Sequence, residues 1–430
     1  MADFDAVVVG AGCAGSVAAY ELASAGKSVL LVERGNYAGA KNMTGGRLYT
    51  HSLERVFPDF REDAPLERRI THERISLMTE DANFTVDFSS DAMEIEGQES
   101  YTVLRAPFDQ WLSSKAEEAG ADLICGIPVE QLLKDESGKV TGIRAGEDEI
   151  SADIVILCDG VNSLLAEQGV GASRPPAEGL AVGIKQTIEL PSSVISDRAL
   201  VATDTDGAAW LFSGYPTLGA FGGGFVYTNR SSISLGIVAG VEAVTKSDSS
   251  ICQMLENFKQ HPAVASLIRG GKVVEHSGHM VPEGGISIMP DLVGDGVLLA
   301  GESAMMCINL GYQVRGMDYA IAAGQMAGIE AAKALDTGDV SKAGLQGYVH
   351  ALHDSFVLKD MQQYSKTPTF MGSFDRMFNL YPTVARDLMN KLFVVDGSPR
   401  EHLKEMAKPT IKQVGLLNLF KDMTGAMKAL

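Results

Sequence analysis

The sequence begins with Asp5-Ala-Val-Val-Val-Gly10-Ala-Gly12-Cys13-Ala14-Gly15, a short apolar run followed by three closely spaced glycines. Residues 6–9 are apolar and mostly β-branched, which is typical of a buried parallel strand. In this spacing the first glycine permits a tight turn, the second lets the backbone approach a pyrophosphate, and the third lets the next helix pack on the strand. The stretch therefore predicts a strand that turns into a helix at a dinucleotide.

The following residues complete this unit. We expect a helix from about Cys13 to Ala25, which Gly26 ends, and a second strand from Ser28 to Val32. Glu33 comes 23 residues after Gly10, where a carboxylate can accept hydrogen bonds from ribose hydroxyls. Because strand, helix, strand and acid are all in register, an accidental turn is the minor interpretation of the glycines.

The composition is that of a globular protein with an acidic excess. The chain has 430 residues, of which 45% are hydrophobic and 21% charged, and a formal net charge of −19. This charge argues against nucleic-acid binding, which needs a basic surface, and it disfavours broad adhesion to anionic lipid. The chain opens directly into a strand and has no uninterrupted apolar run of about 18 residues, so we expect neither a signal peptide nor a spanning helix.

No metal site is expected. The five cysteines are scattered and form no Cys-x-x-Cys pair, which favours buried, reduced thiols in a cytoplasmic protein. The histidine pairs at 276/279 and 350/353 lack an evident third ligand.

The order of the predicted elements indicates two interleaved domains and a helical C-terminal region. Elements of a dinucleotide-binding domain recur in residues 1–70, 101–175 and 281–340. Antiparallel strands are expected in 71–100 and 176–280, and mostly helices in 341–430. The fold class is therefore α/β, or α+β overall, with a Rossmann-like domain and a β-rich substrate or acceptor domain.

Two further strands end in an acidic residue. They are Ile154-Val-Ile-Leu-Cys-Asp159-Gly160 and Gly296-Val-Leu-Leu-Ala-Gly301-Glu302, and in open α/β folds ligands bind at the carboxyl edge of the strands. Arg315-Gly316-Met317-Asp318 then opens a helix, whose start suits an anion. The loop 36–47 carries Lys41, Asn42 and a glycine doublet, which favours a cofactor-lining loop over a plain connection.

Together these motifs resemble the FAD-dependent oxidoreductases with a glutathione-reductase-type FAD domain. Within them the chain is similar to the FixC type, relatives of electron-transfer flavoprotein:quinone oxidoreductase. The signatures are Val32-Glu33-Arg34-Gly35, Ala40-Lys41-Asn42-Met-Thr44-Gly45-Gly46-Arg47-Leu-Tyr49, Leu157-Cys-Asp159-Gly160-Val161-Asn162-Ser163 and Gly311-Tyr-Gln-Val-Arg315-Gly316-Met317-Asp318. The likeness runs over nearly the whole chain and implies FAD as the cofactor.

The resemblance also implies which residues bind FAD. The family has Asp where this chain has Glu302, and the longer side chain keeps the charge but shifts the carboxylate by about a bond length. Arg315 is a candidate to stabilise reduced flavin, with an ion pair as the equal alternative. The implied cofactor-binding residues are Gly10, Gly12, Cys13, Ala14 and Gly15 at the pyrophosphate, Glu33, Arg34, Lys41 and Val129 at the adenosine side, and Asn42, Gly45, Gly46, Arg105, Asp159, Gly160, Gly301, Glu302, Gly311, Arg315, Gly316 and Met317 along the rest of the cofactor.

The flavin would carry the redox chemistry, so we assign no catalytic side chain. The resemblance implies a two-subunit electron-transfer flavoprotein and a small ferredoxin-like iron–sulfur subunit as partners, with quinone or a similar acceptor. It is compatible with a cytoplasmic location and peripheral contact with the inner face of the cell membrane. The alternatives are a flavin monooxygenase, an isoprenoid (geranylgeranyl-type) reductase, and an FAD-binding assembly subunit without turnover.

Overall fold

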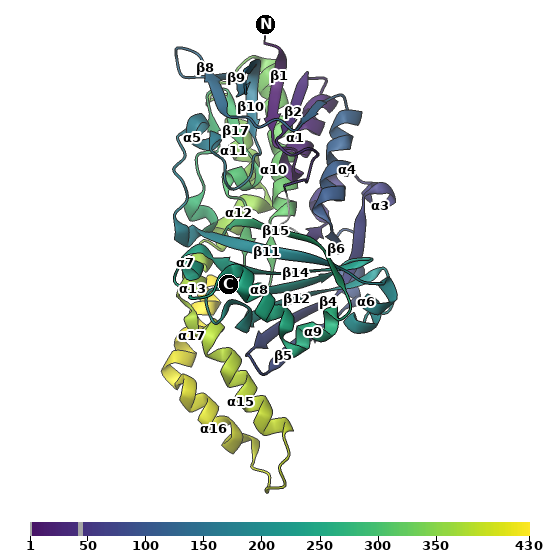
Figure 1. Ribbon diagram of the computed structural model, residues 1–430. Helices are drawn as coiled ribbons and strands as arrows, with labels where there is room; N and C mark the ends of the chain where they lie inside the picture. The colour runs from purple at the N-terminus through teal and green to yellow at the C-terminus, as the bar shows by residue number, and fades with distance from the viewer. Residues whose placement is uncertain (1, 42–45) are drawn as a thin grey trace.

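The computed structural model describes residues 2–41 and 46–430. A mostly parallel sheet covered by helices lies at one end of the molecule, a large antiparallel sheet crosses the middle, and a helical hairpin extends from the other end (Figure 1). The mixed α/β fold with C-terminal helices is thereby confirmed. The described helices are not long and apolar enough to span a bilayer.

The first sheet contains the N-terminal unit. Strand β1 lies parallel between β10 and β2, with Val7 opposite Val155 and Leu30. Residues 6–9 of β1 are at most 5% exposed, as expected for a strand covered on both faces. The sheet order is β16-β17-β10-β1-β2-β7, with β8 and β9 attached to β10; the strands are β1 (Phe4–Val9), β2 (Val29–Glu33), β7 (Asp122–Cys125), β8 (Gln131–Lys134), β9 (Val140–Ala145), β10 (Asp148–Leu157), β16 (Val293–Gly294) and β17 (Val297–Leu299).

Two helices meet closely beside this sheet. Helix α1 (Cys13–Ser24) packs on α10 (Met317–Thr337). A Cβ on Gly324 of α10 would lie 2.2 Å from the main-chain oxygen of Ala14, and one on Gly328 would lie 2.7 Å from that of Ala18. These small residues let the two backbones touch, which fixes where the first turn of α1 lies.

The second sheet is mostly antiparallel and forms the platform of the β-rich region. Its order is β15-β11-β14-β13-β12-β4-β6-β3, with β5 paired to β4; β12 and β4 run parallel. One face packs on helices α8 (Ile251–Gln260) and α9 (Pro262–Ile268) through an apolar cluster that includes Phe212 and Phe258. The strands are β3 (Arg47–Tyr49), β4 (Leu66–Met78), β5 (Asn83–Phe88), β6 (Ser100–Val103), β11 (Leu180–Glu189), β12 (Asp206–Gly214), β13 (Gly222–Thr228), β14 (Ser232–Gly240) and β15 (Lys272–Pro282).

One buried arginine ties this sheet to its loops. Arg68 of β4 is 0% exposed. Its guanidinium donates to the main-chain oxygens of Asn229 at 2.8 Å, Asp206 at 3.0 Å and Ser192 at 3.0 Å. Burial lowers the pKa of Arg68 from its usual value, and these carbonyls replace the water that the charge has lost.

The remaining helices cover the sheets and build the C-terminal extension. Helices α15 and α16 form a hairpin that projects from the body, and α17 returns to α13 (Figure 1). The described helices are α2 (His51–Val56), α3 (Phe60–Asp63), α4 (Arg105–Glu118), α5 (Leu165–Val170), α6 (Ser192–Ala199), α7 (Val241–Thr245), α8 (Ile251–Gln260), α9 (Pro262–Ile268), α11 (Gln346–Asp354), α12 (Phe356–Gln363), α13 (Thr367–Ser373), α14 (Asp375–Asn379), α15 (Tyr381–Phe393), α16 (Leu403–Val414) and α17 (Leu416–Ala429).

Candidate functional site

A groove of about 210 Å³ lies at the carboxyl edge of the parallel sheet. It is formed where β1, β2 and β10 end, so residues from distant parts of the sequence face one another. The predicted residues that line it are Gly10, Gly12, Glu33, Arg34, Lys41, Val129, Asp159, Gly160 and Glu302.

The turn from β1 into α1 has the features of an anion site. Gly10 has a φ of 101°, and a Cβ there would lie 2.3 Å from the main-chain oxygen of Cys158. A Cβ on Gly15 would lie 1.8 Å from the main-chain oxygen of Gly10. Within the described chain, the first turn of α1 has neither an acidic residue nor a side-chain cap. Its main-chain N–H groups and dipole therefore suit a diphosphate.

The carboxylate of Glu33 is held in one orientation at the end of β2. Its Oε2 accepts the main-chain N–H of Ala11 at 3.0 Å, and its Oε1 accepts that of Gly35 at 2.6 Å. Glu33 is only 8% exposed. Because each oxygen has a second lone pair, the fixed carboxylate can still accept ribose hydroxyls from the groove.

Asp159 connects the end of β10 to the short helix η5 (Gly301–Ala304). The Ser303 hydroxyl donates to Oδ1 of Asp159 at 3.1 Å and accepts the main-chain N–H of Gly160 at 3.0 Å. Burial raises the pKa of the Asp159 carboxyl above its usual range. Across the groove, Oε2 of Glu302 lies 3.5 Å from Nε2 of His279. His279 was not predicted as a site residue. It lies two residues before Val281, which lines the cavity described below, so both point from the same face of β15.

Several predicted residues do not line the groove but pack within or beside the elements that form it. Cys13 and Ala14 are buried in the first turn of α1, and a Cβ on Gly301, whose φ is 69°, would lie 2.9 Å from Cβ of Ala14. At the start of α4, the Arg105 guanidinium donates from two nitrogens to the Asp109 carboxylate, each at 2.8 Å. Asn42 and Gly45 lie outside the described residues.

Arg315 takes part in a half-buried charge cluster before α10. Its guanidinium donates to Oδ2 of Asp318 and to Oδ2 of Asp360, each at 2.8 Å. It also lies over the ring of Tyr319, 4.8 Å from the centroid. The ion pair weighed from the sequence is therefore present, with Gly316 and Met317 following at the helix start. The predicted contacts of these three residues with a flavin stay a prediction.

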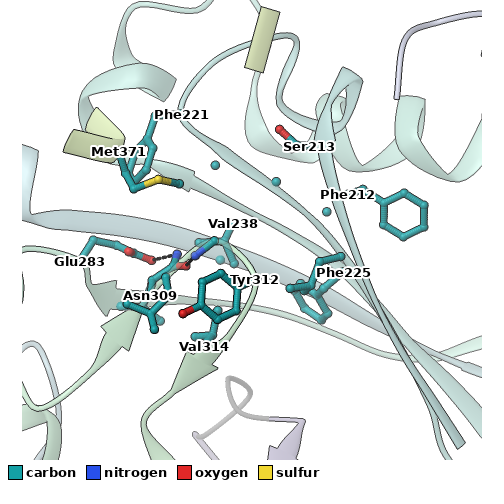
Figure 2. Close-up of a pocket in the computed structure, with 18 of the residues that line it drawn as sticks. Phe212, Ser213, Phe221, Phe225, Val238, Glu283, Asn309, Tyr312, Val314 and Met371 are labelled. Carbon is teal, nitrogen blue, oxygen red and sulfur yellow. Dashed lines mark hydrogen bonds between the residues drawn. The ribbon is translucent and has the colours of Figure 1, made fainter. Parts of the chain in front are cut away.

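A second, larger and mainly apolar cavity of about 350 Å³ lies on the antiparallel sheet. Figure 2 shows Phe225, Val238 and Tyr312 on one side of it and Phe221 and Met371 on another. Gly46 and Gly311 are the predicted residues that reach it. Arg47, which ends the loop predicted to line the cofactor, also reaches it, whereas sequence reasoning missed its other polar members, which are Lys185, Ser213, Tyr227, Glu283, Asn309 and Tyr312.

Three segments lead from the groove to this cavity. The loop after β2 contributes Lys41 to the groove and Gly46 to the cavity. Strand β15 and the residue after it contribute His279 to the groove, and Val281 and Glu283 to the cavity. The third segment contributes Glu302 to the groove and Cys307 to the cavity. An extended ligand that occupies the groove would therefore present its far end to an apolar compartment.

Comparisons with known proteins agree with this geometry. Residues 3–198 match the FAD binding domain, and residues 367–430 match the ETF-QO/FixC family C-terminal domain. Protein FixC of Escherichia coli K12 is 52% identical over 97% of both chains. The probable electron transfer flavoprotein-quinone oxidoreductase YdiS of the same strain is 48% identical, also over 97% of both.

The solved structures are similar in fold. A geranylgeranyl bacteriochlorophyll reductase-like protein from Thermoplasma acidophilum has a TM-score of 0.72 at 19% identity and covers 96% of this chain and 98% of its own. The flavin-dependent brominase Bmp2 has a TM-score of 0.63 at 17% identity, with 95% and 98% coverage.

Proposed function

This chain belongs to the FixC and electron-transfer flavoprotein–quinone oxidoreductase family, and on that premise we propose that it passes electrons from a two-subunit electron-transfer flavoprotein, through FAD, to a quinone. The family resemblance and FAD as the cofactor of its N-terminal domain, both predicted from the sequence, are confirmed. The electron path and its partners are the proposal.

The groove fits two parts of an FAD molecule that differ in chemistry, the adenosine ribose and the diphosphate. Glu33 would hold the adenosine ribose, and the start of α1 with Lys41 would hold the diphosphate. Gly46 approaches Tyr227 so closely that a Cβ would lie 2.8 Å from the ring, so a larger residue would clash at this point of the cavity wall. When bound, FAD accepts and releases electrons singly or in pairs.

The observation that carries the proposed acceptor is the apolar cavity at the end of the groove. Its walls are mainly aliphatic and aromatic, with few polar groups. An apolar acceptor gains free energy by leaving water for such a site. A quinone has a polar ring and an apolar tail, and it matches both the few polar groups and the walls. The proposal therefore assigns the cavity to the acceptor.

We also propose that the C-terminal hairpin contacts the membrane in which the quinone dissolves. Phe393 ends α15, Val394 and Val395 follow it before α16, and the three are 61–76% exposed. Residues 386–430 contain eight basic and five acidic residues, whereas the whole chain has a net charge of −19. Apolar side chains flanked by basic ones favour an anionic lipid surface. The expected partner that completes the path is the small ferredoxin-like iron–sulfur subunit implied by the family resemblance.

One experiment tests the electron path. The FAD-loaded protein is reduced under anaerobic conditions, and its reoxidation by decylubiquinone is followed by the flavin absorbance. We expect rapid reoxidation by the quinone and reduction by the copurifying electron-transfer flavoprotein. Rapid NADPH oxidation with oxygen insertion would instead support a monooxygenase, and reduction of a prenyl chain an isoprenoid reductase. A protein that takes up no FAD, or whose reduced FAD ignores quinones, would refute the proposal.

The membrane contact has its own test. Vesicles containing anionic lipid should carry the wild-type protein in a flotation assay, and added salt should weaken this binding. Val394→Asp with Val395→Asp should abolish flotation while the flavin spectrum stays unchanged. Flotation of the double variant equal to that of the wild type would refute the assignment of the hairpin.

A further inference from the structure

Glu283 is the only carboxylate side chain among the described residues that line the apolar cavity. It follows directly after β15, and its main-chain N–H donates to the oxygen of Gly179 at 2.8 Å. The N–H of Gly284 donates to the same oxygen at 3.0 Å. The backbone that carries the carboxyl group is therefore held on both sides, so its position in the cavity is defined.

Asn309 fixes the orientation of this carboxyl group. Its Nδ2 donates to Oε1 of Glu283 at 3.2 Å, and its Oδ1 accepts the main-chain N–H of Gly311 at 2.9 Å. Because the amide oxygen is already engaged, the NH₂ group must face Glu283. Figure 2 shows this pair at the wall of the cavity, next to Tyr312 and Val238. One carboxyl oxygen is thus anchored, and the other is left for a ligand.

The surroundings bring the pKa of Glu283 close to neutral pH, where its protonated and ionised forms are both populated. Burial raises the pKa of its carboxyl to about 7, although the hydrogen bond from Asn309 acts to lower it. The two cationic side chains of the cavity are already engaged, because Arg47 pairs with Glu73 and Nζ of Lys185 lies 3.5 Å from Glu275. Burial lowers the pKa of Lys185 from its usual value, although the carboxylate of Glu275 acts to raise it.

The phenol and thiol groups around the cavity keep one state near neutral pH. Burial raises the pKa values of Tyr227, Tyr312 and the Cys307 thiol, so these groups stay protonated. Leu430 also lines the cavity. Among the acidic side chains of the described cavity lining, Glu283 is therefore the one whose proton can be exchanged between pH 6 and 8.

We propose that Glu283 is the proton donor to the acceptor that is reduced in this cavity, an inference that rests on the proposed function. Reduction of a quinone to a quinol consumes two electrons, which the reduced FAD supplies, and two protons. In the transfer from Glu283 its O–H bond breaks and an O–H bond forms on the quinone oxygen that faces it. The carboxylate that results keeps the hydrogen bond from Asn309 and takes a new proton from solvent, and the opposite quinone oxygen takes the second proton from solvent to complete the quinol.

Glu283→Gln tests this role, because it keeps the size and the hydrogen-bonding capacity of the side chain but cannot release a proton. Reoxidation of the reduced protein by decylubiquinone should slow by about 100-fold or more, because a positioned general acid typically contributes about 10²–10⁴-fold. The wild-type rate should fall as the pH rises through about 7, since the protonated form is the donor, whereas the variant should lack this limb. Glu136→Gln, on an exposed turn, is the control and should behave as the wild type.

An infrared titration and a binding measurement test the role of Glu283 without turnover. Infrared difference titration should show a protonated carboxyl band that disappears near pH 7 in the wild type and is missing from Glu283→Gln. Asn309→Leu removes the hydrogen bond that lowers the Glu283 pKa, so the band and the rate limb should both move to higher pH. The affinity for a non-reducible quinone analogue should change less than threefold in Glu283→Gln.

The outcomes separate the two levels of the proposal. A Glu283→Gln protein with the wild-type rate and pH profile overturns the donor role and leaves the electron path intact. A wild type whose reduced FAD no quinone reoxidises overturns the proposed function, and the donor role with it. If Glu283→Gln does not fold, the pH limb of Asn309→Leu decides, because an unshifted limb contradicts titration of Glu283.

Discussion

Replacing Glu33 with glutamine should weaken both the fold and the binding of FAD. The carboxylate accepts the main-chain N–H groups of Ala11 and Gly35 on its two oxygens. Glutamine has one oxygen and one NH₂ group, so either orientation of the amide leaves one of these N–H groups facing another donor. A buried donor without a partner costs about 1–3 kcal/mol, and the remaining bond loses about 1 kcal/mol when its acceptor becomes neutral. We therefore expect the free energy of unfolding to fall by about 2–4 kcal/mol.

The same substitution should lower the affinity for FAD by roughly 5- to 30-fold, because the ribose would lose a charged acceptor worth about 1–2 kcal/mol. Urea unfolding of the FAD-free protein and titration of FAD by fluorescence quenching measure the two effects. Glu147→Gln is the control, since Glu147 is exposed in a hairpin turn. If Glu33→Gln matches this control in both assays, the carboxylate does not hold the groove as its hydrogen bonds indicate.

Three further predictions concern the framework around the two cavities. Gly324→Val should lower the free energy of unfolding by at least about 1–3 kcal/mol through overpacking against Ala14, whereas Gly372→Ala, where a Cβ meets open space, should be tolerated; thermal unfolding compares them. Arg68→Met should cost at least about 3 kcal/mol in urea unfolding, because several buried carbonyls lose their donor, and a loss below 1 kcal/mol would contradict this. The hydrogen bonds from Arg376 and from the Tyr381 hydroxyl lower the pKa of Asp422, so their stabilisation is present at neutral pH and is lost as the pH falls below about 4; hydrogen exchange in α17 should rise over that range in the wild type and stay flat in Asp422→Asn.

The first strand, the glycine turn and the helix after it could be predicted from the sequence, because their backbone conformation depends on neighbouring residues. The backbone at Gly10, with its positive φ, and the close approach of Gly15 depend on residues within one strand–turn–helix unit. The alternation of apolar runs with helical segments likewise predicted the layers of the fold. The strand-end residues Asp159 and Glu302 could be placed beside this unit, since carboxyl ends of parallel strands share one edge.

The apolar cavity could not be predicted in the same way. Its lining comes from short pieces of nine strands, the connections between them and the helices α13 and α14, and no single piece carries a distinctive spacing. The ion pairs of Arg315 were one of two interpretations left open by the sequence, and the second partner, Asp360, lies 45 residues further along the chain.

What the sequence determined by itself is therefore the nucleotide-binding turn, the class of cofactor and the order of the layers, because these follow from backbone conformation and periodicity over neighbouring residues. Only the tertiary structure decided that Glu283 and Asn309 form a hydrogen bond at the wall of a mainly apolar cavity. A carboxyl group changes its proton affinity through desolvation, and desolvation depends on every segment that closes around it rather than on the residues beside it in the chain.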